Sequence, residues 1–381
     1  MNILTISVDR KLFDSGSDVS KRMIACGGMV DSWHIVVFNV KNNKQFYKDQ
    51  SLSNNVFVYP INSLVKATYF FSALRVMSRI LYKNKIDIIT TQDSFELGLL
   101  GWWVRMRHHL PLQLQVHTDI LSPYYRKESL HNRLRYFIAM WLVKRANGIR
   151  VVSSRIASSL INKWHIDSSR IFQLPVLIDS DKLMSSDRSS NWLKDKYPQF
   201  EHIFLMASRF SKEKNIALAI ESMVTIVKEC PRVGLIIIGE GLEKGLLESL
   251  VKKLLLEDNV VFLSWKENLA DYYKGADAFI LSSNYEGYAM TIVEAMMMGQ
   301  LVIATDVGIV GEILINMENG LVVPVGDQKK LTEAMNTAIS NKELGKQLQE
   351  RAISIKSKVL GEKEFLESYK ETLEKTIKNY D

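Results

Sequence analysis

The sequence predicts an α/β protein with two doubly wound domains, each built on its own parallel sheet. The chain has 381 residues, enough for two separate hydrophobic cores. Short, continuously apolar runs recur along the whole chain, which is typical of strands covered on both faces. Segments of helical periodicity lie between these runs; Ile216, Ile220, Met223 and Val227, for example, share one helix face.

The apolar runs place the expected strands. In the first half they are 3–8, 33–40, 56–59, 86–91, 112–117 and 149–154. In the second half they are 203–208, 233–239, 260–263, 278–283, 301–305 and 321–324. We therefore expect one domain over 1–185 and another over 200–362, with the polar stretch 180–199 as the linker and a last helix over about 363–381.

Composition indicates an ordinary globular protein, with 47% apolar and 24% charged residues. The apolar run 136–143 is too short to span a bilayer, and the N-terminus lacks the features of a signal peptide. Cys26 and Cys230 stand outside any CxxC pattern, so neither a disulfide framework nor a zinc site is expected. A cytoplasmic location is the simplest interpretation.

The charge distribution points to an anionic partner for the first half. Residues 1–185 hold 25 Lys and Arg against 13 Asp and Glu, a balance of +12, whereas residues 186–381 hold 24 against 29, a balance of −5. The basic, aromatic segment within 101–145 has three interpretations: a solvated face, an RNA surface, or a patch on an anionic membrane surface. No RNA-binding signature is present, so we expect no nucleic-acid partner. Membrane contact would place the protein peripherally on the inner face of the membrane.

Ligands of open α/β sheets bind beyond the carboxyl ends of the strands. After the run 278–283 come Glu286 and a helix expected to begin near Thr291 and to contain Glu294. The backbone amides of Gly287, Tyr288, Ala289 and Met290 then lie at a helix N-terminus, which attracts phosphate. Glu294 can accept two hydrogen bonds, and a ribose diol supplies two donors.

Further candidates follow other strands. Arg209 and Lys214 flank the turn after 203–208, where both can point at one diphosphate; alternatively they are ordinary surface charges. His117 and Asp119 follow 112–117, and a lone histidine is often structural rather than catalytic. Gly16, in the loop after the first strand, permits close approach of a ligand.

These residues resemble a known family, the retaining, nucleotide-sugar-dependent glycosyltransferases of the GT-B fold, family 4 type. The resemblance covers nearly the whole chain and is weakest over 40–85 and 180–200. Five motifs in the family's order carry it: QDSFELG (92–98), QVHTD (115–119), SRFSKEKN (208–215), IIIGEG (236–241) and EGYAMTIVE (286–294) with its tail EAMMMG.

The resemblance implies roles position by position. Glu294 would bind the ribose hydroxyls, Glu286 the sugar hydroxyls, and Arg209 and Lys214 the leaving diphosphate. His117 would lie near the anomeric carbon. The remaining donor-side residues would be Gly16, Gly287, Tyr288, Ala289, Met290 and Thr291, and the acceptor side would hold Asp93, Glu96 and Asp119. The last helix would pack back on the first domain, and two such domains would face a cleft.

The chain departs from the family pattern at three positions. It has Gly16-Ser17 where the family usually has two glycines, Ala289 where it has glycine, and Leu301 where it has proline. Alanine at 289 leaves less room beside the donor.

The expected function is transfer of a sugar from a nucleoside diphosphate sugar to a glycan or lipid-linked acceptor, in polysaccharide or glycolipid synthesis. A nucleotide-sugar epimerase of the same fold and a non-catalytic binding subunit are the alternatives. We expect no cofactor and no metal. Asp179-Ser-Asp181 resembles the metal-binding DxD of another glycosyltransferase fold, but that pattern is common by chance. Gly239-Glu-Gly241 misses the dinucleotide-binding spacing and is expected to be a tight turn.

Overall fold

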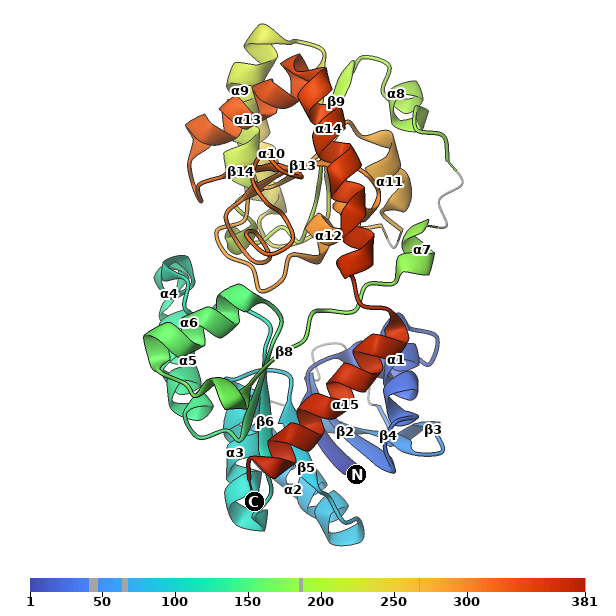
Figure 1. Ribbon diagram of the computed structural model, residues 1–381, viewed down its shortest axis with the longest axis vertical. Helices are drawn as coiled ribbons and strands as arrows, with labels where there is room; N and C mark the ends of the chain where they lie inside the picture. Colours follow the sequence, from blue (N-terminus) through green and yellow to red (C-terminus); the bar gives the residue numbers. More distant parts are fainter. Residues whose placement is uncertain (41–46, 64–67, 185–187, 267, 381) are drawn as a thin grey trace. The chain divides into compact units, whose positions relative to one another are not determined.

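The structure, a computed structural model, describes residues 1–40, 47–63, 68–184, 188–266 and 268–380 (Figure 1). The chain divides into two compact units. Unit 1 comprises Met1–Leu121, Ser129–Pro175 and Gly361–Asp381, and unit 2 comprises Ser122–Glu128 and Val176–Leu360.

Unit 1 is built on an eight-stranded sheet in the order β3-β4-β2-β1-β5-β6-β7-β8. All its neighbouring strands are parallel except the antiparallel edge pair β3 and β4. The strands are β1 (Asn2–Ser7), β2 (Ser32–Val40), β3 (Gln50–Ser53), β4 (Val56–Ser63), β5 (Ile88–Thr91), β6 (Leu112–Val116), β7 (Gly148–Val151) and β8 (Ile171–Gln173).

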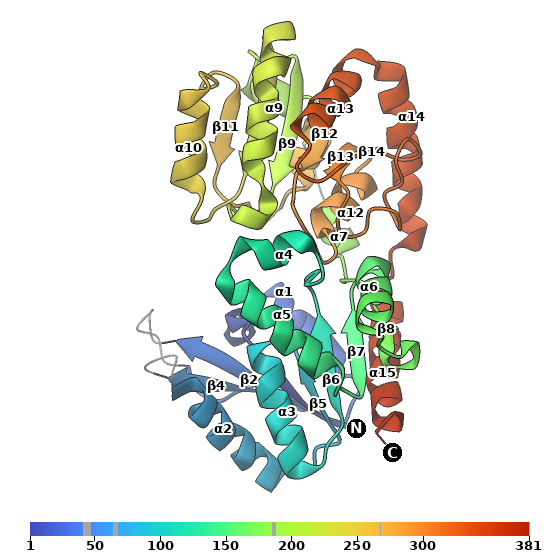
Figure 2. The same ribbon diagram turned by 90° about the vertical axis from the view of Figure 1, so that its left-hand side faces the viewer.

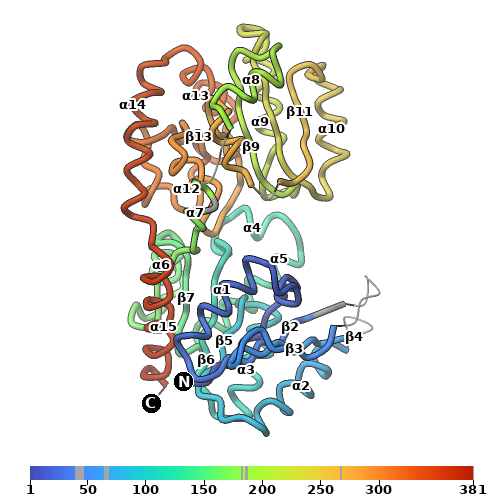
Figure 3. Tube along the Cα trace, turned by 90° about the vertical axis from the view of Figure 1, so that its right-hand side faces the viewer, coloured from blue at the N-terminus to red at the C-terminus, as the bar shows by residue number. Residues whose placement is uncertain are grey.

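Helices cover both faces of this sheet. They are η1 (Arg10–Phe13), α1 (Asp18–Gly27), α2 (Tyr69–Lys83), α3 (Glu96–His108), α5 (Leu130–Val143), α6 (Ser154–Trp164), η4 (Ser168–Arg170) and α15 (Glu362–Lys378). Figure 2 shows α2, α3 and α5 side by side in front of the sheet, and Figure 3, from the other side, shows α1 and α15. The sheet is therefore a buried layer, which explains its continuously apolar strands.

The C-terminal helix α15 is joined to unit 1 by buried amide contacts. Gln113 of β6 donates from Nε2 to the backbone oxygen of Thr372 at 3.0 Å and to Oγ1 of Thr376 at 2.9 Å. Gly148 of β7 leaves room for this helix, because an added Cβ there would lie 2.0 Å from Oγ1 of Thr376. The expectation that the last helix returns to the first domain is confirmed.

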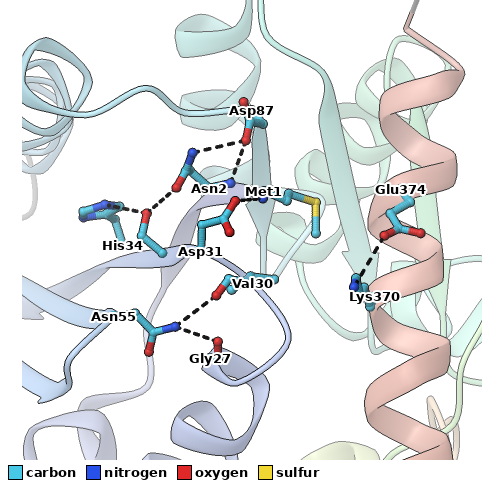
Figure 4. Close-up of polar contacts among 11 residues, drawn as sticks. Met1, Asn2, Gly27, Val30, Asp31, His34, Asn55, Asp87, Lys370 and Glu374 are labelled. Carbon is cyan, nitrogen blue, oxygen red and sulfur yellow. Dashed lines mark hydrogen bonds and ion pairs between the residues drawn. The ribbon is translucent and has the colours of Figure 1, made fainter.

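Polar contacts hold the amino ends of several strands in unit 1 (Figure 4). Asp87, just before β5, accepts a hydrogen bond from the backbone amide of Asn2 in β1 at 2.7 Å. Asn55, just before β4, donates from Nδ2 to the backbone oxygens of Gly27 at 2.7 Å and Val30 at 3.0 Å. The first contact joins the amino ends of β1 and β5, and the second joins the start of β4 to the end of α1. Both lie at the amino ends of the strands, opposite the carboxyl ends where ligands of such sheets bind.

Unit 2 is built on a six-stranded, wholly parallel sheet in the order β11-β10-β9-β12-β13-β14. The strands are β9 (His202–Ala207), β10 (Val233–Ile238), β11 (Val260–Leu263), β12 (Ala278–Leu281), β13 (Leu301–Thr305) and β14 (Leu321–Val323). The helices are α4 (Pro123–Glu128), α7 (Ser180–Met184), α8 (Trp192–Lys196), η5 (Lys212–Lys214), α9 (Ile216–Glu229), α10 (Lys244–Lys253), α11 (Ala270–Gly275), α12 (Met290–Met297), α13 (Gln328–Ser340), α14 (Lys342–Ile353) and η6 (Ser354–Lys358).

One apolar cluster holds unit 2 together. Alternate residues of β10, such as Leu235 and Ile237, pack against Ile220 and Met223 of α9, and all four are fully buried. Each such side chain contributes about 1.5 to 3 kcal/mol on removal from water. This rigid layer carries the loops that follow the strands.

The predicted fold class is confirmed: two parallel α/β sheets, with a C-terminal helix packed on the first. All twelve expected strands are present, and two short edge strands, β3 and β8, were not expected. The polar stretch 180–199, expected to be the linker, contains α7 and α8, and its residues 185–187 lie outside the described part.

Candidate active site

Two loops at the carboxyl edge of unit 2, residues 208–215 after β9 and residues 282–290 after β12, are joined by hydrogen bonds. Ser282 Oγ donates to the backbone oxygens of Lys214 at 3.1 Å and Asn215 at 2.9 Å. The amide of Asn284 donates to the backbone oxygen of Glu213 at 2.7 Å, and its side chain meets that of Asn215 at 3.1 Å. These hydrogen bonds hold the two loops together, so side chains of one loop lie beside side chains of the other.

Lys214 and Glu286 form an ion pair across these two loops. Nζ of Lys214 lies 2.6 Å from Oε1 of Glu286, and both side chains are largely buried. The same Oε1 accepts a hydrogen bond from Ser283 Oγ at 2.7 Å. Ser283 is held in turn by Thr305 Oγ1, which donates to its backbone oxygen at 2.6 Å. The pair presents a fixed positive and a fixed negative group side by side.

Arg209 belongs to the same loop as Lys214 but extends into solvent. Its side chain is 78% exposed, and its Nη2 lies 3.5 Å from Oε1 of Glu213. Glu213 is oriented by Ser211 Oγ, which donates to the same oxygen at 2.6 Å. An exposed guanidinium on a positioned loop can reach a bidentate anion such as a phosphate.

Gly239 and Gly241, in the turn after β10, pack closely against the backbone of the loop 208–215. An added Cβ at Gly239 would lie 1.9 Å from the backbone oxygen of Ser208, and one at Gly241 would lie 2.3 Å from that of Phe210. The amide of Phe210 donates to the backbone oxygen of Glu240 at 2.8 Å. The two glycines therefore let the backbones of neighbouring loops touch, which is how this tight turn contributes to the site.

Glu294 lies on α12, partly exposed, and is held by a buried tyrosine. Tyr273 of α11 donates from its hydroxyl to Oε2 of Glu294 at 2.9 Å. Burial, together with the charge of Glu294, raises the pKa of Tyr273 well above its ordinary value, so this phenol stays protonated and donates. The Tyr273 ring packs edge-on against Phe279 of β12, with centroids 5.5 Å apart. One carboxylate oxygen of Glu294 is thus fixed from beneath the helix.

The turn into α12 has an unusual backbone at Ala289. This residue has φ 71° and ψ 61°, the left-handed region that costs a side chain with a Cβ roughly 1 to 2 kcal/mol. Gly308, after β13, packs against the same turn, because an added Cβ there would lie 2.8 Å from the backbone oxygen of Tyr288. Tyr288 is buried, which raises the pKa of its hydroxyl to about 12. The stretch Gly287–Thr291 is therefore held tightly at the start of the helix.

In unit 1, His117 and Asp119 follow β6. Nε2 of His117 lies 2.9 Å from Oε1 of Gln115, and Oδ1 of Asp119 accepts from the amide of Leu121 at 3.2 Å. Solvent reaches the His117 side chain, yet the protein around it is dense enough to disfavour its charged form. This desolvation, with the positive charges of Arg150 and Arg22, lowers the pKa of His117 to about 3, so the imidazole is neutral at pH 7.

Asp93 and Glu96, after the neighbouring strand β5, have structural partners. Oδ1 of Asp93 accepts from the amides of Phe95 at 2.8 Å and Leu97 at 3.1 Å at the start of α3. Burial raises the pKa of Asp93. Glu96 is exposed and pairs with Nε of Arg135 in α5 at 2.9 Å. Their predicted place on the acceptor side stays a prediction.

Gly16 lies in the exposed turn before α1. Its amide donates to Oδ1 of Asp14 at 3.0 Å, and Ser17, the next residue, caps the helix by accepting from the amide of Ser20. The open space around Gly16 agrees with its predicted contact with a ligand but does not test it.

Sequence reasoning missed several supporting residues. Tyr273 and Thr305 contact the site from other elements, so no local pattern indicates them. Ser283 stands three residues before Glu286, and this spacing within one loop was a usable signal.

The described residues hold no group of three or more His, Cys, Asp or Glu arranged to bind a metal ion. Asp179 and Asp181 are both exposed, at the start of α7. None of the helices in the described part of the chain has the length and apolarity needed to cross a membrane.

Comparisons with known proteins agree with this geometry. Residues 31–182 match the model of Glycosyltransferase Family 4, and residues 193–355 match that of Glycosyl transferases group 1. N-acetyl-alpha-D-glucosaminyl L-malate synthase of Bacillus anthracis is 25% identical over 304 residues, which cover 78% of this chain and 75% of that protein. Alpha-monoglucosyldiacylglycerol synthase of Streptococcus pneumoniae is 28% identical over 231 residues, 58% of this chain and 52% of that protein.

Solved structures share the fold. Sucrose-phosphate synthase of Thermosynechococcus elongatus superposes with a TM-score of 0.80 at 19% identity, covering 97% of this chain and 98% of that one. Anabaena HepE in complex with UDP-glucose superposes with a TM-score of 0.76 at 19% identity, covering 98% and 99%. With both units matched by family models, the chain belongs to the family 4 glycosyltransferases, retaining enzymes of the GT-B fold that use nucleotide sugars.

Proposed function

We propose that this glycosyltransferase moves a hexose or hexosamine from a uridine diphosphate sugar to a hydroxyl of a glycan or lipid-linked acceptor, in polysaccharide or glycolipid synthesis. The observation that carries the proposal is the Lys214–Glu286 pair, 2.6 Å apart, on loops at the carboxyl edge of unit 2. This edge is where open α/β sheets bind their ligands.

The donor nucleotide is held by unit 2 in this proposal. Glu294, fixed by Tyr273 at 2.9 Å, accepts from the two ribose hydroxyls. The backbone at the start of α12, Gly287–Thr291, faces the diphosphate with the positive end of the helix dipole. Gly16, in the turn before α1, is assigned to phosphate binding by its resemblance to the family motif.

Arg209 and Lys214 supply the positive charge that the reaction needs. As the bond between the anomeric carbon and the diphosphate oxygen breaks, negative charge grows on the diphosphate, and two cations beside it lower the barrier. The acceptor oxygen bonds to the anomeric carbon on the face that the diphosphate leaves, and the hydroxyl proton passes to an oxygen of the departing diphosphate. In this proposal Arg209 and Lys214 supply the positive charge that a metal ion supplies in other transferases. The proposal therefore includes no metal and no cofactor.

Glu286 is assigned to the hydroxyls of the donor sugar. Its Oε1 already serves Lys214 and Ser283, and a second carboxylate oxygen gives it further acceptor capacity. His117 of unit 1 is assigned to the neighbourhood of the anomeric carbon. Asp93, Glu96 and Asp119 are assigned to the acceptor side.

The identity of the substrates is supported by relatives. Two similar proteins are named for transfer to malate and for synthesis of a glucosyl diacylglycerol, and HepE was solved with UDP-glucose. The UDP-glucose in the HepE complex supports a UDP-linked donor, and the diacylglycerol in the second name supports a lipid-linked acceptor.

A membrane surface is the partner proposed for unit 1, and the support comes from α2, α3 and α5. We call these three helices the basic apolar face. Together they carry seven Arg or Lys residues and one acidic residue, Glu96. Their largest exposed apolar side chains include Phe71, 74% exposed, and Leu130, 79% exposed.

Apolar side chains of this face also contact one another. Phe70 of α2 meets Trp103 of α3 edge-on, with centroids 6.3 Å apart. An open hollow of about 350 Å³ between α3 and α5 is lined by four apolar or aromatic residues, Leu99, Phe137, Ile138 and Trp141. Apolar groups flanked by Lys and Arg suit the headgroup zone of an anionic bilayer. The protein would then act peripherally at the cytoplasmic surface.

Calorimetric titration with a panel of nucleoside diphosphates and their sugars tests the donor proposal. We expect one UDP-sugar to bind and to stabilise the protein, by about 2.7 kcal/mol at 100 times its Kd. Glu294→Ala should strongly weaken this binding, whereas Glu257→Ala, which changes an exposed carboxylate after α10, should not. Binding of no nucleotide, or equal binding by both variants, would contradict the proposal.

A further inference from the structure

A buried polar network in unit 1 connects His117 to an arginine that no part of the proposed reaction uses. Arg150 of β7 is buried, with 6% of its surface exposed. Its guanidinium lies over the ring of Tyr369 in α15, with Cζ 4.8 Å from the centroid, and donates from Nη1 to Oε1 of Gln115 at 3.1 Å. A buried charge is costly, so its presence beside a site residue calls for a function.

Arg150 fixes the orientation of the Gln115 amide. A guanidinium only donates hydrogen bonds, so the group of Gln115 that faces it must be the carbonyl oxygen. The amide nitrogen then donates to Oγ1 of Thr90 at 3.1 Å and to the hydroxyl of Tyr369 at 2.9 Å. A flipped amide would set N–H groups against the N–H groups of Arg150.

The oriented amide determines the proton on His117. Nε2 of His117 lies 2.9 Å from the same Oε1 of Gln115, which only accepts, so Nε2 must donate. In a neutral imidazole the other nitrogen is then the acceptor. We infer that Arg150, acting through Gln115, is a positioning residue that holds His117 in the tautomer with its proton on Nε2 and leaves Nδ1 as an acceptor.

The surroundings of His117 keep it in this neutral form. The charged groups near it are Arg150 on β7 and Arg22 on α1, and both disfavour a second proton. Tyr369 on α15 and Cys26 on α1 lie within reach of the Arg150 charge, and burial raises the pKa of both, that of Cys26 to about 11. Asp119, in the loop after β6, is the nearest acidic residue along the chain and directs Oδ1 to the amide of Leu121.

In this tautomer the imidazole can act as a hydrogen-bond acceptor toward a substrate. Nδ1 can accept a hydrogen bond from a substrate hydroxyl, and a neutral ring adds no positive charge where a sugar cation develops. That consequence rests on the proposed function, whereas the tautomer itself does not. The proposed function places His117 near the anomeric carbon. The network adds a specific role, which is to accept a hydrogen bond from a substrate hydroxyl.

Long-range nitrogen–proton NMR of the histidine rings tests the inference on the whole protein without substrate. The His117 signals are those that vanish in His117→Asn. We expect a protonated Nε2 and an unprotonated Nδ1, with no titration between about pH 5 and pH 8. A proton on Nδ1, or titration in this range, would overturn the inference.

Two variants separate the network from general packing. Gln115→Met removes the acceptor and should give a mixture of tautomers, whereas Gln113→Met, which also loses an amide contact with α15 but does not touch His117, should keep the Nε2-H form.

A third variant tests the contact through the pKa of His117. Gln115→Glu places a carboxylate against Nε2 and should raise the pKa of His117, with a matching shift of the acid limb of kcat/KM.

The outcomes also distinguish this inference from the proposed function. Retention of the Nε2-H tautomer in folded Gln115→Met would contradict the inference even if the enzyme transfers sugar. The expected tautomer in a protein that binds no nucleotide sugar would support the inference and reject the proposed function.

Discussion

Nζ of Lys214 lies 2.6 Å from Oε1 of Glu286, and this one contact joins the loop after β9 to the loop after β12. Both side chains are largely buried, so neither can leave the other without a cost of several kcal/mol. The contact therefore holds a cation and an acceptor at the carboxyl edge of unit 2 before any ligand binds, which is the preorganisation that catalysis of group transfer requires.

Lys214→Met should lower kcat by about 10- to 1000-fold, because it removes one positive charge beside the leaving diphosphate. KM for the donor should change less, since the charge matters most in the transition state. Steady-state kinetics with the donor varied measure both values.

Lys212→Met is the matched control for that variant. Lys212 lies in the same short helix, η5, but its side chain is exposed. It should retain kcat within a few fold. Equal losses in the two variants would show that general charge, rather than the position of Lys214, supports the reaction.

Tyr273→Phe should weaken donor binding by about 2- to 10-fold, because one hydrogen bond to Glu294 is lost while the ring still packs on Phe279. Tyr272→Phe, on the same helix with its ring against Trp192, should leave affinity unchanged. Isothermal titration with the donor measures both. If the two substitutions have the same effect, Glu294 does not depend on Tyr273.

Ala289→Gly should raise the free energy of unfolding by about 1 kcal/mol, because alanine at φ 71° is strained and glycine is not. Ala295→Gly, inside α12, should lower it by about the same amount through lost helix propensity. Urea denaturation measures both. A loss of stability in Ala289→Gly would mean that its buried methyl group outweighs the backbone strain.

The double variant Arg107→Gln/Arg133→Gln should weaken binding to anionic vesicles by about 2 kcal/mol, since each cation near the surface contributes about 1 kcal/mol. Arg105 and Arg135 are unsuitable for this test, because Arg105 donates to the backbone of Arg145 and Arg135 pairs with Glu96. Vesicle sedimentation measures the binding.

The charge-matched control for the membrane test is Lys252→Gln/Lys253→Gln, at the exposed end of α10 in unit 2. It should bind anionic vesicles as the natural protein does. Binding of the natural protein to neither kind of vesicle would identify the basic apolar face as an ordinary solvated surface. Equally strong binding to neutral and anionic vesicles would contradict the role given to its positive charge.

The fold was predictable from sequence because its strands are buried on both faces. A run such as VGLIIIG can be little else, and β10 occupies Val233–Ile238. The missed strands lack that signal: β3 is QSLS, polar and at the sheet edge, and β8 has only three residues. Local sequence patterns therefore predict the order of strands and helices, but they do not predict the short edge strands of the sheet.

The site was predictable in part, for a related reason. Residues that follow a strand, such as Lys214 and Glu286, can be found from the strand pattern and a family motif. The partners that orient site residues come from elements that are separate in the sequence. Tyr273 of α11 contacts Glu294 of α12, and Arg150 of β7 contacts Gln115 of the adjacent strand β6. Backbone strain at Ala289 was also invisible, because sequence shows the residue and not its φ.

Product analysis after reaction of a UDP-sugar with a hydroxyl acceptor tests the central claim most directly. The mass of the acceptor and the anomeric carbon–proton coupling of the new glycoside, read by NMR, report transfer and configuration together. The account predicts an acceptor heavier by one sugar residue, joined with the donor's anomeric configuration, and released UDP. An isomerised nucleotide sugar with an unchanged acceptor, or a glycoside of inverted configuration, would contradict it.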